Sequence, residues 1–167
     1  SDTMDIRKLD PGTPESINIF ITCEKDSRSY CELDQKSGAF MLKRVLKLPF
    51  PGFYGFIPRT HHIDAEPLDA LVLSSEPISQ GIVVQTRSIG IIRLSGNSPD
   101  DILIAVLIND KTYGKTQDLL TLNKEELDKL KNFLEELKGK KFQDMFDAPH
   151  SKRSFERAVE LYRREFE

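Results

Sequence analysis

Three carboxylates fall within the six-residue segment 64–69 and give the sequence its clearest potential for chemistry. They are Asp64, Glu66 and Asp69, and Pro67 stiffens the bend that carries them because its φ is fixed. Clustered carboxylates repel one another, and a hard divalent cation that prefers oxygen ligands, such as Mg²⁺, offsets that repulsion. Asp100 and Asp101, just before an apolar run, are further candidates that could add a ligand. The segment is therefore either a magnesium site or an ordinary polar loop, and its spacing does not match an EF-hand calcium loop.

Side chains suited to phosphate lie elsewhere in the chain. Mg²⁺ in proteins commonly binds together with a phosphate-bearing substrate, which also needs cations and hydroxyl donors. Arg44 precedes the proline- and glycine-rich segment 48–58, Tyr54 lies within it, and Lys138 lies at the end of a helical pattern. Taken singly, Arg44 and Lys138 are more simply explained as surface charges, and Tyr54 as a packed aromatic.

Histidine and cysteine give weaker signals for a metal. His61 and His62 are adjacent, and neighbouring side chains on an extended chain point to opposite faces, so the pair is not expected to bind one ion. Cys23 and Cys31 lack the companion Cys or His spacing of a zinc or redox motif.

The first two-thirds of the chain is predicted to form strands. Residues 17–22 and 30–34 alternate with a period of two, which is typical of strands. Further strands are predicted over residues 40–46, 70–73, 82–86, 88–94 and 102–108. Segment 48–58 holds three prolines and two glycines, so we expect an ordered, packed loop rather than a helix or a central strand.

The last third changes to a helical period. Leu127, Leu130, Leu134 and Leu137 recur every three or four residues, with Asn123 as a candidate N-cap, and Gly139 as a candidate C-cap residue. A second apolar stripe runs from Phe155 to Phe166 and predicts a helix entered from Ser151 or Ser154. Strands followed by helices favour an α+β fold, mainly β, with a small barrel or curled sheet and helices packed outside.

Composition bounds the classes of function. The 167 residues carry 24 basic and 27 acidic side chains, and this balance argues against an electrostatic nucleic-acid binder. No apolar run approaches the ~20 residues of a membrane helix. Two cysteines and no visible signal peptide favour a reducing cytoplasm. We expect residues 1–3 to be a cleavage scar before Met4 and residues 4–167 to form one domain.

The ordered set of motifs resembles the soluble family I inorganic pyrophosphatases, from about Ile17 to the C-terminus. Segment 30–34, with Ser37 and Gly38 after it, is similar to the family's Lys-Tyr-Glu-x-Asp hairpin. Tyr-Gly-Phe-Ile-Pro at 54–58 is similar to the family's Asn-Tyr-Gly-Phe-Ile-Pro. Asp-Ala-Glu-Pro-Leu-Asp at 64–69 resembles the signature Asp-x-Asp-Pro-x-Asp with one change.

The resemblance implies an OB-like five-stranded β-barrel with two C-terminal helices packed outside. It also implies Mg²⁺-dependent hydrolysis of pyrophosphate to two phosphates by a metal-activated water, in a homo-oligomer. Carried over residue by residue, it gives Asp64, Asp69, Asp100 and Glu32 as metal ligands. It gives Glu66, at the position of the water-activating aspartate, and Tyr54 as catalytic residues, and Arg44, Tyr54 and Lys138 as substrate-binding residues.

The chain departs from the family pattern at several site positions. They are Ile21, Tyr30, Phe50, Ile102, Leu137, and either Gly96 or Asn97. Most of these changes replace charged or hydroxyl groups by apolar ones. Two hypotheses follow: a working magnesium-dependent pyrophosphatase, or a relative with weakened turnover that binds phosphate or nucleotide or acts on another phosphoanhydride.

Overall fold

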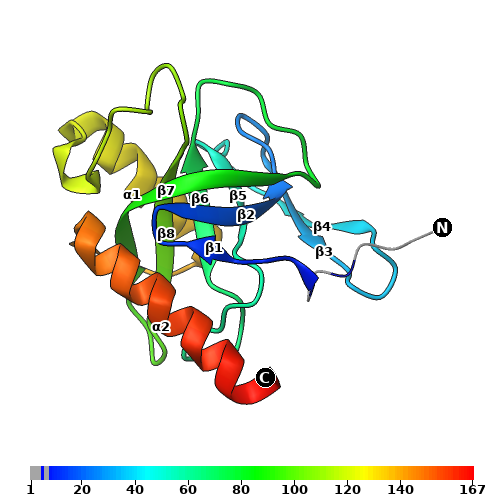
Figure 1. The fold of residues 1–167 in the computed structure, drawn as a ribbon. Helices are drawn as coiled ribbons and strands as arrows, with labels where there is room; N and C mark the ends of the chain where they lie inside the picture. The colour runs from blue at the N-terminus through cyan, green and yellow to red at the C-terminus, as the bar shows by residue number, and fades with distance from the viewer. Residues whose placement is uncertain (1–4, 6–7) are drawn as a thin grey trace.

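The computed structural model describes residue 5 and residues 8–167. The expected cleavage scar at residues 1–3 and the expected domain start at Met4 lie outside the described residues. Figure 1 shows the strands gathered into one curved body, with both long helices on its outside and the β3–β4 hairpin projecting from one side. The elements are β1 (Gly12–Thr13), β2 (Ser16–Cys23), β3 (Ser29–Leu33), β4 (Phe40–Val45), β5 (Phe53–Phe56), β6 (Asp69–Leu73), β7 (Val83–Leu94), β8 (Asp100–Leu107), η2 (Leu119–Thr121), α1 (Lys124–Lys138), β9 (Phe142–Phe146) and α2 (Ala148–Phe166).

Five strands form a closed barrel. The hydrogen-bonded order runs β2, β5, β6, β8, β7, and β7 pairs back onto β2, so the ring has no open edge. β6 and β8 pair in parallel, whereas the other pairs of the ring are antiparallel. This confirms the predicted five-stranded barrel with helices outside. None of the described helices has the length and apolar character to cross a membrane.

The strands bury side chains on both faces, and each helix covers one of the resulting clusters. Leu71 and Ile104 belong to a cluster that includes the apolar stripe of α1, represented by Phe133. The alternate residues of the same strands belong to a second cluster with Phe155 of α2. Because side chains alternate across a strand, one closed sheet supports two cores.

The expectation that segment 48–58 contains no central strand is wrong. β5 lies inside this segment, between β2 and β6. Its four residues contain no proline, since Pro51 precedes the strand and Pro58 follows it. Gly55 permits the close approach of β2, because a Cβ there would lie 1.8 Å from the Phe20 carbonyl oxygen. The prolines bound the strand rather than preventing it.

Three further boundaries differ from the prediction. The two expected strands over 82–86 and 88–94 are one strand, β7, with a register shift between Ser88 and Gly90 that interrupts the alternation. The short strand β9 was not predicted, because Phe142–Phe146 lacks a regular apolar pattern. α2 begins at Ala148, with Asp147 as its N-cap, rather than at Ser151 or Ser154.

The predicted caps of the first helix are confirmed. The Asn123 side chain accepts a hydrogen bond from the Glu126 backbone N–H at 2.8 Å, and Gly139 ends α1 in the left-handed conformation at φ 64°. These caps fix where α1 stops, and therefore where Lys138, its last residue, is presented.

Candidate active site

A cleft of about 420 Å³ opens where strands from distant parts of the chain meet. In the parallel pair of β6 and β8, Asp69 lies opposite Ile102, so both strands begin at the same end of the sheet. Asp69 is the first residue of β6, and Asp100 and Asp101 open β8. The topology therefore brings carboxylates some 30 positions apart in sequence to one rim.

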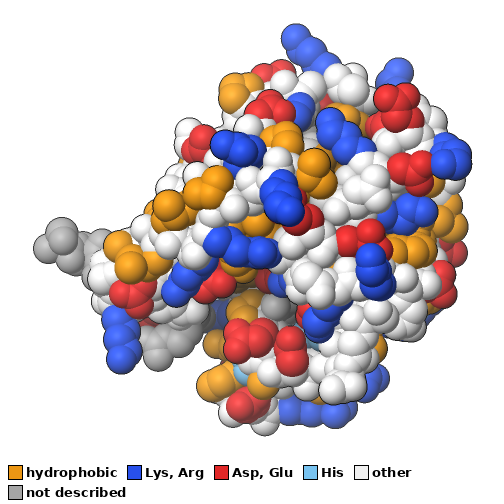
Figure 2. Space-filling model, turned by 180° about the vertical axis from the view of Figure 1, so that it is seen from behind, with side chains coloured by type: hydrophobic (Ala, Val, Ile, Leu, Met, Phe, Trp, Pro, Cys, Tyr) orange, Lys and Arg blue, Asp and Glu red, His pale blue; other side chains and the backbone are white. Residues whose placement is uncertain are grey.

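Most of the sequence-predicted site residues line this cleft together. They are Glu32, Tyr54, Asp64, Glu66, Asp69, Asp100 and Lys138. They come from β3, β5, the loop before β6, β6 itself, β8 and the end of α1. Figure 2 shows acidic and basic side chains interspersed over the face that it presents, without a broad area of one sign.

Asp69 is held between a tyrosine and a lysine. Its Oδ2 accepts a hydrogen bond from the Tyr54 hydroxyl at 2.8 Å and another from Lys138 Nζ at 2.7 Å. Burial and the Asp69 charge raise the pKa of Tyr54 well above its usual range, so its hydroxyl stays protonated as a donor. Burial opposes the charge of Lys138, but the Asp69 carboxylate outweighs it and raises the pKa of the ammonium.

The carboxylates that open β8 have cationic partners too. Lys140 Nζ lies 3.0 Å from Asp100 Oδ2. Asp101 accepts two hydrogen bonds from Arg93, at 2.7 and 3.0 Å, and its Oδ2 lies 3.6 Å from His62 Nε2. Burial works against ionisation of Asp101, but its pairing with His62 and Arg93 prevails and lowers its pKa to about 2.

The loop before β6 presents Asp64 and Glu66 to solvent. Ala65 between them has φ 64°, and the Glu66 backbone N–H donates to Asp64 Oδ1 at 3.0 Å. The Glu66 carbonyl accepts from the His62 N–H at 2.8 Å. This turn holds the backbone, while both side chains remain exposed at the cleft. Exposed carboxylates at a cleft are available to an incoming cation or water.

Arg44 is the sequence-predicted site residue that the structure does not place in the cleft lining. Its guanidinium donates to the carbonyls of Glu136, at 3.2 Å, and Leu137, at the end of α1. A cation there interacts favourably with the helix C-terminus. Arg44 lies opposite Tyr30 in the β3–β4 hairpin. It therefore fixes the turn of helix that carries Lys138, and its direct contact with phosphate stays a prediction.

The donor chemistry of the cleft fits a hard divalent cation, because its wall offers several carboxylates. These carboxylates are spread around the wall. Among the described residues, no group of three or more His, Cys, Asp or Glu side chains is gathered to hold one ion. That arrangement is compatible with Mg²⁺, which often takes one or two carboxylates and completes its shell with water and substrate phosphate.

The positions that depart from the family pattern are mainly structural. Ile21, Phe50, Ile102 and Leu137 are buried, with at most 4% of each residue exposed. Tyr30 differs, because it lines the cleft and donates its hydroxyl to Glu32 at 2.9 Å. At most of these positions the side chain therefore packs in the core.

Sequence reasoning did not predict Thr22 and His62 as part of the cleft wall, whereas Asp101 was a candidate ligand and Tyr30 a site position that departs from the family pattern. The opposite orientation expected for the two histidines is seen: His61 contacts Glu165 of α2, and His62 faces Asp101. Asp101 was expected as a candidate ligand beside Asp100, but its pairing with Arg93 was not, because that pairing depends on the register of β7 and β8, where Arg93 lies opposite Asp101. A local motif contains no information about that register.

The family described as "Inorganic pyrophosphatase" matches residues 19–166. A Helicobacter pylori protein named inorganic pyrophosphatase is 38% identical over 141 residues, which are 81% of this chain and 82% of that protein. An Arabidopsis thaliana protein named soluble inorganic pyrophosphatase 1 is 33% identical over 134 residues, 78% of this chain. The match spans 63% of the Arabidopsis protein, so the chain covers less than two-thirds of that relative.

A solved structure has the same fold. A structure of inorganic pyrophosphatase from Helicobacter pylori superimposes with a TM-score of 0.86 at 34% identity, covering 93% of this chain and 99% of that one. The agreement extends over nearly the whole chain, and therefore over the strands and the helix that form the cleft.

Proposed function

The chain belongs to the inorganic pyrophosphatase family, and from that premise we propose that it hydrolyses pyrophosphate to two phosphates with Mg²⁺ as cofactor. Family membership implies a divalent metal in general, and the choice of Mg²⁺ is part of the proposal. The observation that carries it is Asp69, which bonds to both Tyr54 and Lys138 inside a carboxylate-lined cleft. Carboxylates that can bind metal, a partly buried cation and a hydroxyl donor in one cleft suit a phosphate-bearing substrate.

Asp64, Asp69, Asp100 and Glu32 are the proposed ligands of Mg²⁺, because all four line the cleft. When bound, such ions neutralise phosphate charge and acidify a water molecule. Lys140 already neutralises Asp100 across 3.0 Å. The paired lysines thus limit carboxylate repulsion when no ion is bound.

Lys138 and Tyr54 are proposed to bind the substrate from the wall beside Asp69. The partly buried ammonium supplies a positive charge toward the phosphate oxygens, in a site where water screens it less than at an open surface. The Tyr54 hydroxyl keeps its proton and is oriented by Asp69, so its role is donation rather than proton removal. Arg44 remains a proposed phosphate ligand and also anchors the end of α1.

Glu66 is the proposed acceptor of the water proton. Its carboxylate is exposed at the cleft, within a turn held by the Asp64 side chain. In hydrolysis the water oxygen forms a bond to one phosphorus, the bridging P–O bond breaks, and a proton must leave the attacking water. A positioned carboxylate performs that transfer at neutral pH.

Several whole-protein properties belong to the same proposal. We propose that residues 4–167 act as one pyrophosphatase-like domain, that the protein is a homo-oligomer, and that it works in the cytoplasm. The support is the family resemblance together with the sparse cysteine content of the sequence. Nucleic acid and membrane are not among the proposed partners.

One structural observation favours a second candidate, a relative with weakened turnover. Ile21, Ile102 and Leu137 stand at positions where the family has charged or hydroxyl side chains, and each is buried here. Fewer ligands and fewer cations then face the substrate. Under this second candidate the cleft binds phosphate or nucleotide, or acts on another phosphoanhydride, with slow pyrophosphate turnover.

Steady-state hydrolysis of pyrophosphate in Mg²⁺, compared with equilibrium binding of pyrophosphate, separates the two candidates. The proposed function predicts many turnovers by the wild type and a loss of roughly 100-fold or more in Asp69→Asn. Asp128→Asn is the matched control, because Asp128 is also paired with a lysine, Lys124, but lies outside the cleft. Binding without turnover would support the second candidate, and full activity in Asp69→Asn would contradict the site assignment.

A further inference from the structure

A second cleft, of about 440 Å³, lies beside the first and is not used by the proposed reaction. It is formed between α2, the segment around His62 and the turn before β8. His62 and Asp101 line both clefts, so they form a shared wall. A cavity of this size lies within the range that small-molecule ligands occupy.

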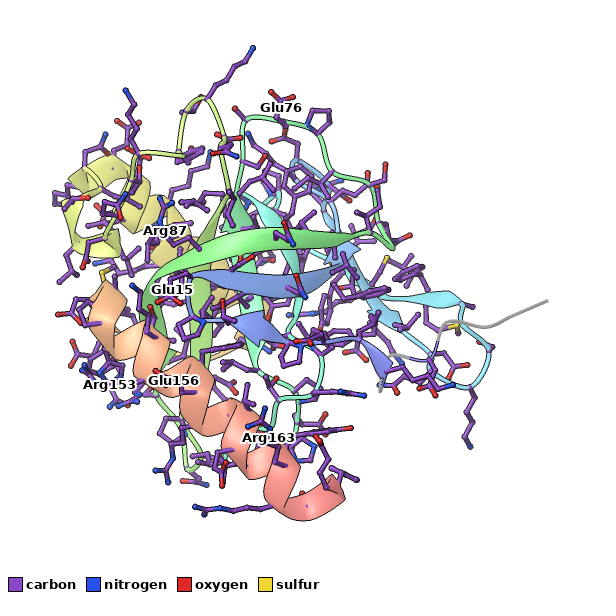
Figure 3. All side chains as sticks on the ribbon, viewed as in Figure 1. Glu15, Glu76, Arg87, Arg153, Glu156 and Arg163 are labelled. Atoms are coloured by element: carbon purple, nitrogen blue, oxygen red, sulfur yellow. The ribbon has the colours of Figure 1, made fainter. Side chains whose placement is uncertain are left out.

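Two arginines of α2 give this second cleft unneutralised positive charge. Arg153 and Arg157 both line it, and residues four apart lie on one face of a helix. Both are exposed, and within the described part of the chain neither forms an ion pair. Figure 3 shows Arg153 on the half of α2 nearer its N-terminus, and Arg163 on the half nearer its C-terminus. Two guanidinium groups on one face suit a phosphate group.

The other two charged side chains in the described lining, Arg93 and Asp101, neutralise each other. Among its described lining residues, Asp101 is the one carboxylate, and it is engaged by Arg93 through two hydrogen bonds. That pairing leaves the charges of Arg153 and Arg157 uncompensated. The cleft therefore carries positive charge that would attract an anion.

The floor of the second cleft is apolar. Ile63, which is 61% exposed, and the partly buried Leu161, one helical turn from Arg157, supply the accessible apolar surface, and Leu68 and Ala158 lie buried beneath it. Inorganic phosphate has no group that would use such a floor, whereas a flat organic group would bury against it. The two arginines and the apolar floor together favour a phosphorylated molecule that has a planar organic part.

We propose that this second cleft binds a nucleoside phosphate, with its phosphates on Arg153 and Arg157 and its base against Ile63 and Leu161. The site is separate from the cleft around Asp69, and the two share the wall of His62 and Asp101. Binding of a nucleoside phosphate in the second cleft does not depend on whether the first cleft hydrolyses pyrophosphate.

Calorimetric titration of the full chain with ADP, in buffer without Mg²⁺, tests the proposal. We expect saturable binding to the wild type, and affinity weakened by roughly tenfold or more in the double variant Arg153→Gln/Arg157→Gln. Arg163→Gln is the matched control, since Arg163 lies on the same helix but lines another pocket. It should bind ADP like the wild type, and both the double arginine variant and Arg163→Gln should hydrolyse pyrophosphate at the wild-type rate.

Two further titrations make the result specific. Lys138→Gln should keep its ADP affinity, because Lys138 lies in the first cleft. Inorganic phosphate should bind at least about tenfold more weakly than ADP, because it cannot use the apolar floor. Absence of ADP binding, equal affinity in the double arginine variant, dependence on Lys138, or phosphate affinity equal to that of ADP would each overturn the proposal.

Discussion

At the scale of single residues, Asp69 links the proposed metal site to the proposed substrate-binding side chains. Its Oδ2 takes both a hydroxyl and an ammonium donor, so an arriving cation must share or displace these donors. If a metal ion took over this carboxylate, Lys138 would be free to contact the substrate. In the proposed site, metal binding and substrate binding are therefore coupled through one oxygen atom.

Tyr54→Phe tests the hydroxyl donor. The substitution removes the 2.8 Å bond to Asp69 and keeps the buried ring, so we expect kcat to fall about tenfold and the free energy of unfolding to change by ~1 kcal/mol. Steady-state kinetics and urea unfolding measure the two effects. Tyr113→Phe is the control, because Tyr113 lies outside the cleft. Equal kcat in Tyr54→Phe and wild type would exclude a catalytic role of the hydroxyl.

The lowered pKa of Asp101 predicts that the free energy of unfolding depends on pH. Its pKa is lowered in the folded protein to about 2, so its stabilising contribution is present above the unfolded value near pH 4 and is lost as pH falls toward 2. Removing the charge in Asp101→Asn should lower the free energy of unfolding at pH 7 by ~2 kcal/mol. The difference from the wild type should shrink between pH 4 and pH 2.

Urea unfolding of both proteins across that pH range measures the effect. Asp128→Asn, at an exposed ion pair on α1, provides the comparison and should leave stability at neutral pH little changed. A difference between Asp101→Asn and wild type that stays constant from pH 7 to pH 2 would contradict the depressed pKa.

At the scale of elements, local patterns predicted the type of most strands and both helices. Alternation identified β2 and β3, and periodicity with capping residues identified α1. Pairing was not predictable from local pattern. β5 was missed because its flanking prolines suggested a loop. The four residues between those prolines are enough to pair with both β2 and β6, and this pairing is visible only in the closed barrel.

The same limit applies to the candidate site. The segment 64–69 was identified from its own spacing, because neighbouring carboxylates are visible in sequence. The pairing of Asp101 with Arg93 arises from strand register, and the contact of Lys138 with Asp69 from where α1 ends against the barrel. Arg44 has the chemistry of a phosphate ligand, but its place near the end of α1 gives it carbonyl partners.

Gly55→Ala tests the close approach of β2 and β5. A Cβ at Gly55 would lie 1.8 Å from the Phe20 carbonyl oxygen, so we expect a loss of about 3 kcal/mol or more in the free energy of unfolding. Gly139→Ala is the matched control, since its Cβ meets no atom within 4 Å and the cost there is left-handed strain of ~1–2 kcal/mol. Thermal or urea unfolding distinguishes them. Equal losses would mean that the barrel yields easily at Gly55.

At the scale of the whole molecule, 27 acidic and 24 basic residues leave little net charge, and the structure shows how the balance is used locally. Lysines or arginines offset Asp69, Asp100 and Asp101, whereas Asp64 and Glu66 remain exposed. Neighbouring cations thus offset part of the acidic charge of the cleft, and Asp64 and Glu66 are the carboxylates that the proposal leaves accessible to a metal ion.

Mg²⁺ should stabilise the folded protein through this cleft. A ligand at ~100 times its dissociation constant adds ~2.7 kcal/mol, which corresponds to a rise in Tm of roughly 5–10 °C for a domain of this size. Differential scanning calorimetry with Mg²⁺ should show the rise in the wild type. Asp64→Asn/Asp69→Asn should lose it, and an unchanged rise in that double variant would place the ion elsewhere.

Release of inorganic phosphate from pyrophosphate by the wild-type chain, as Mg²⁺ is raised from zero, tests the central claim most directly. We predict negligible release without Mg²⁺, many turnovers per chain once it is present, and two phosphates for each pyrophosphate consumed. Release that never exceeds the uncatalysed background at any Mg²⁺ concentration would contradict the account.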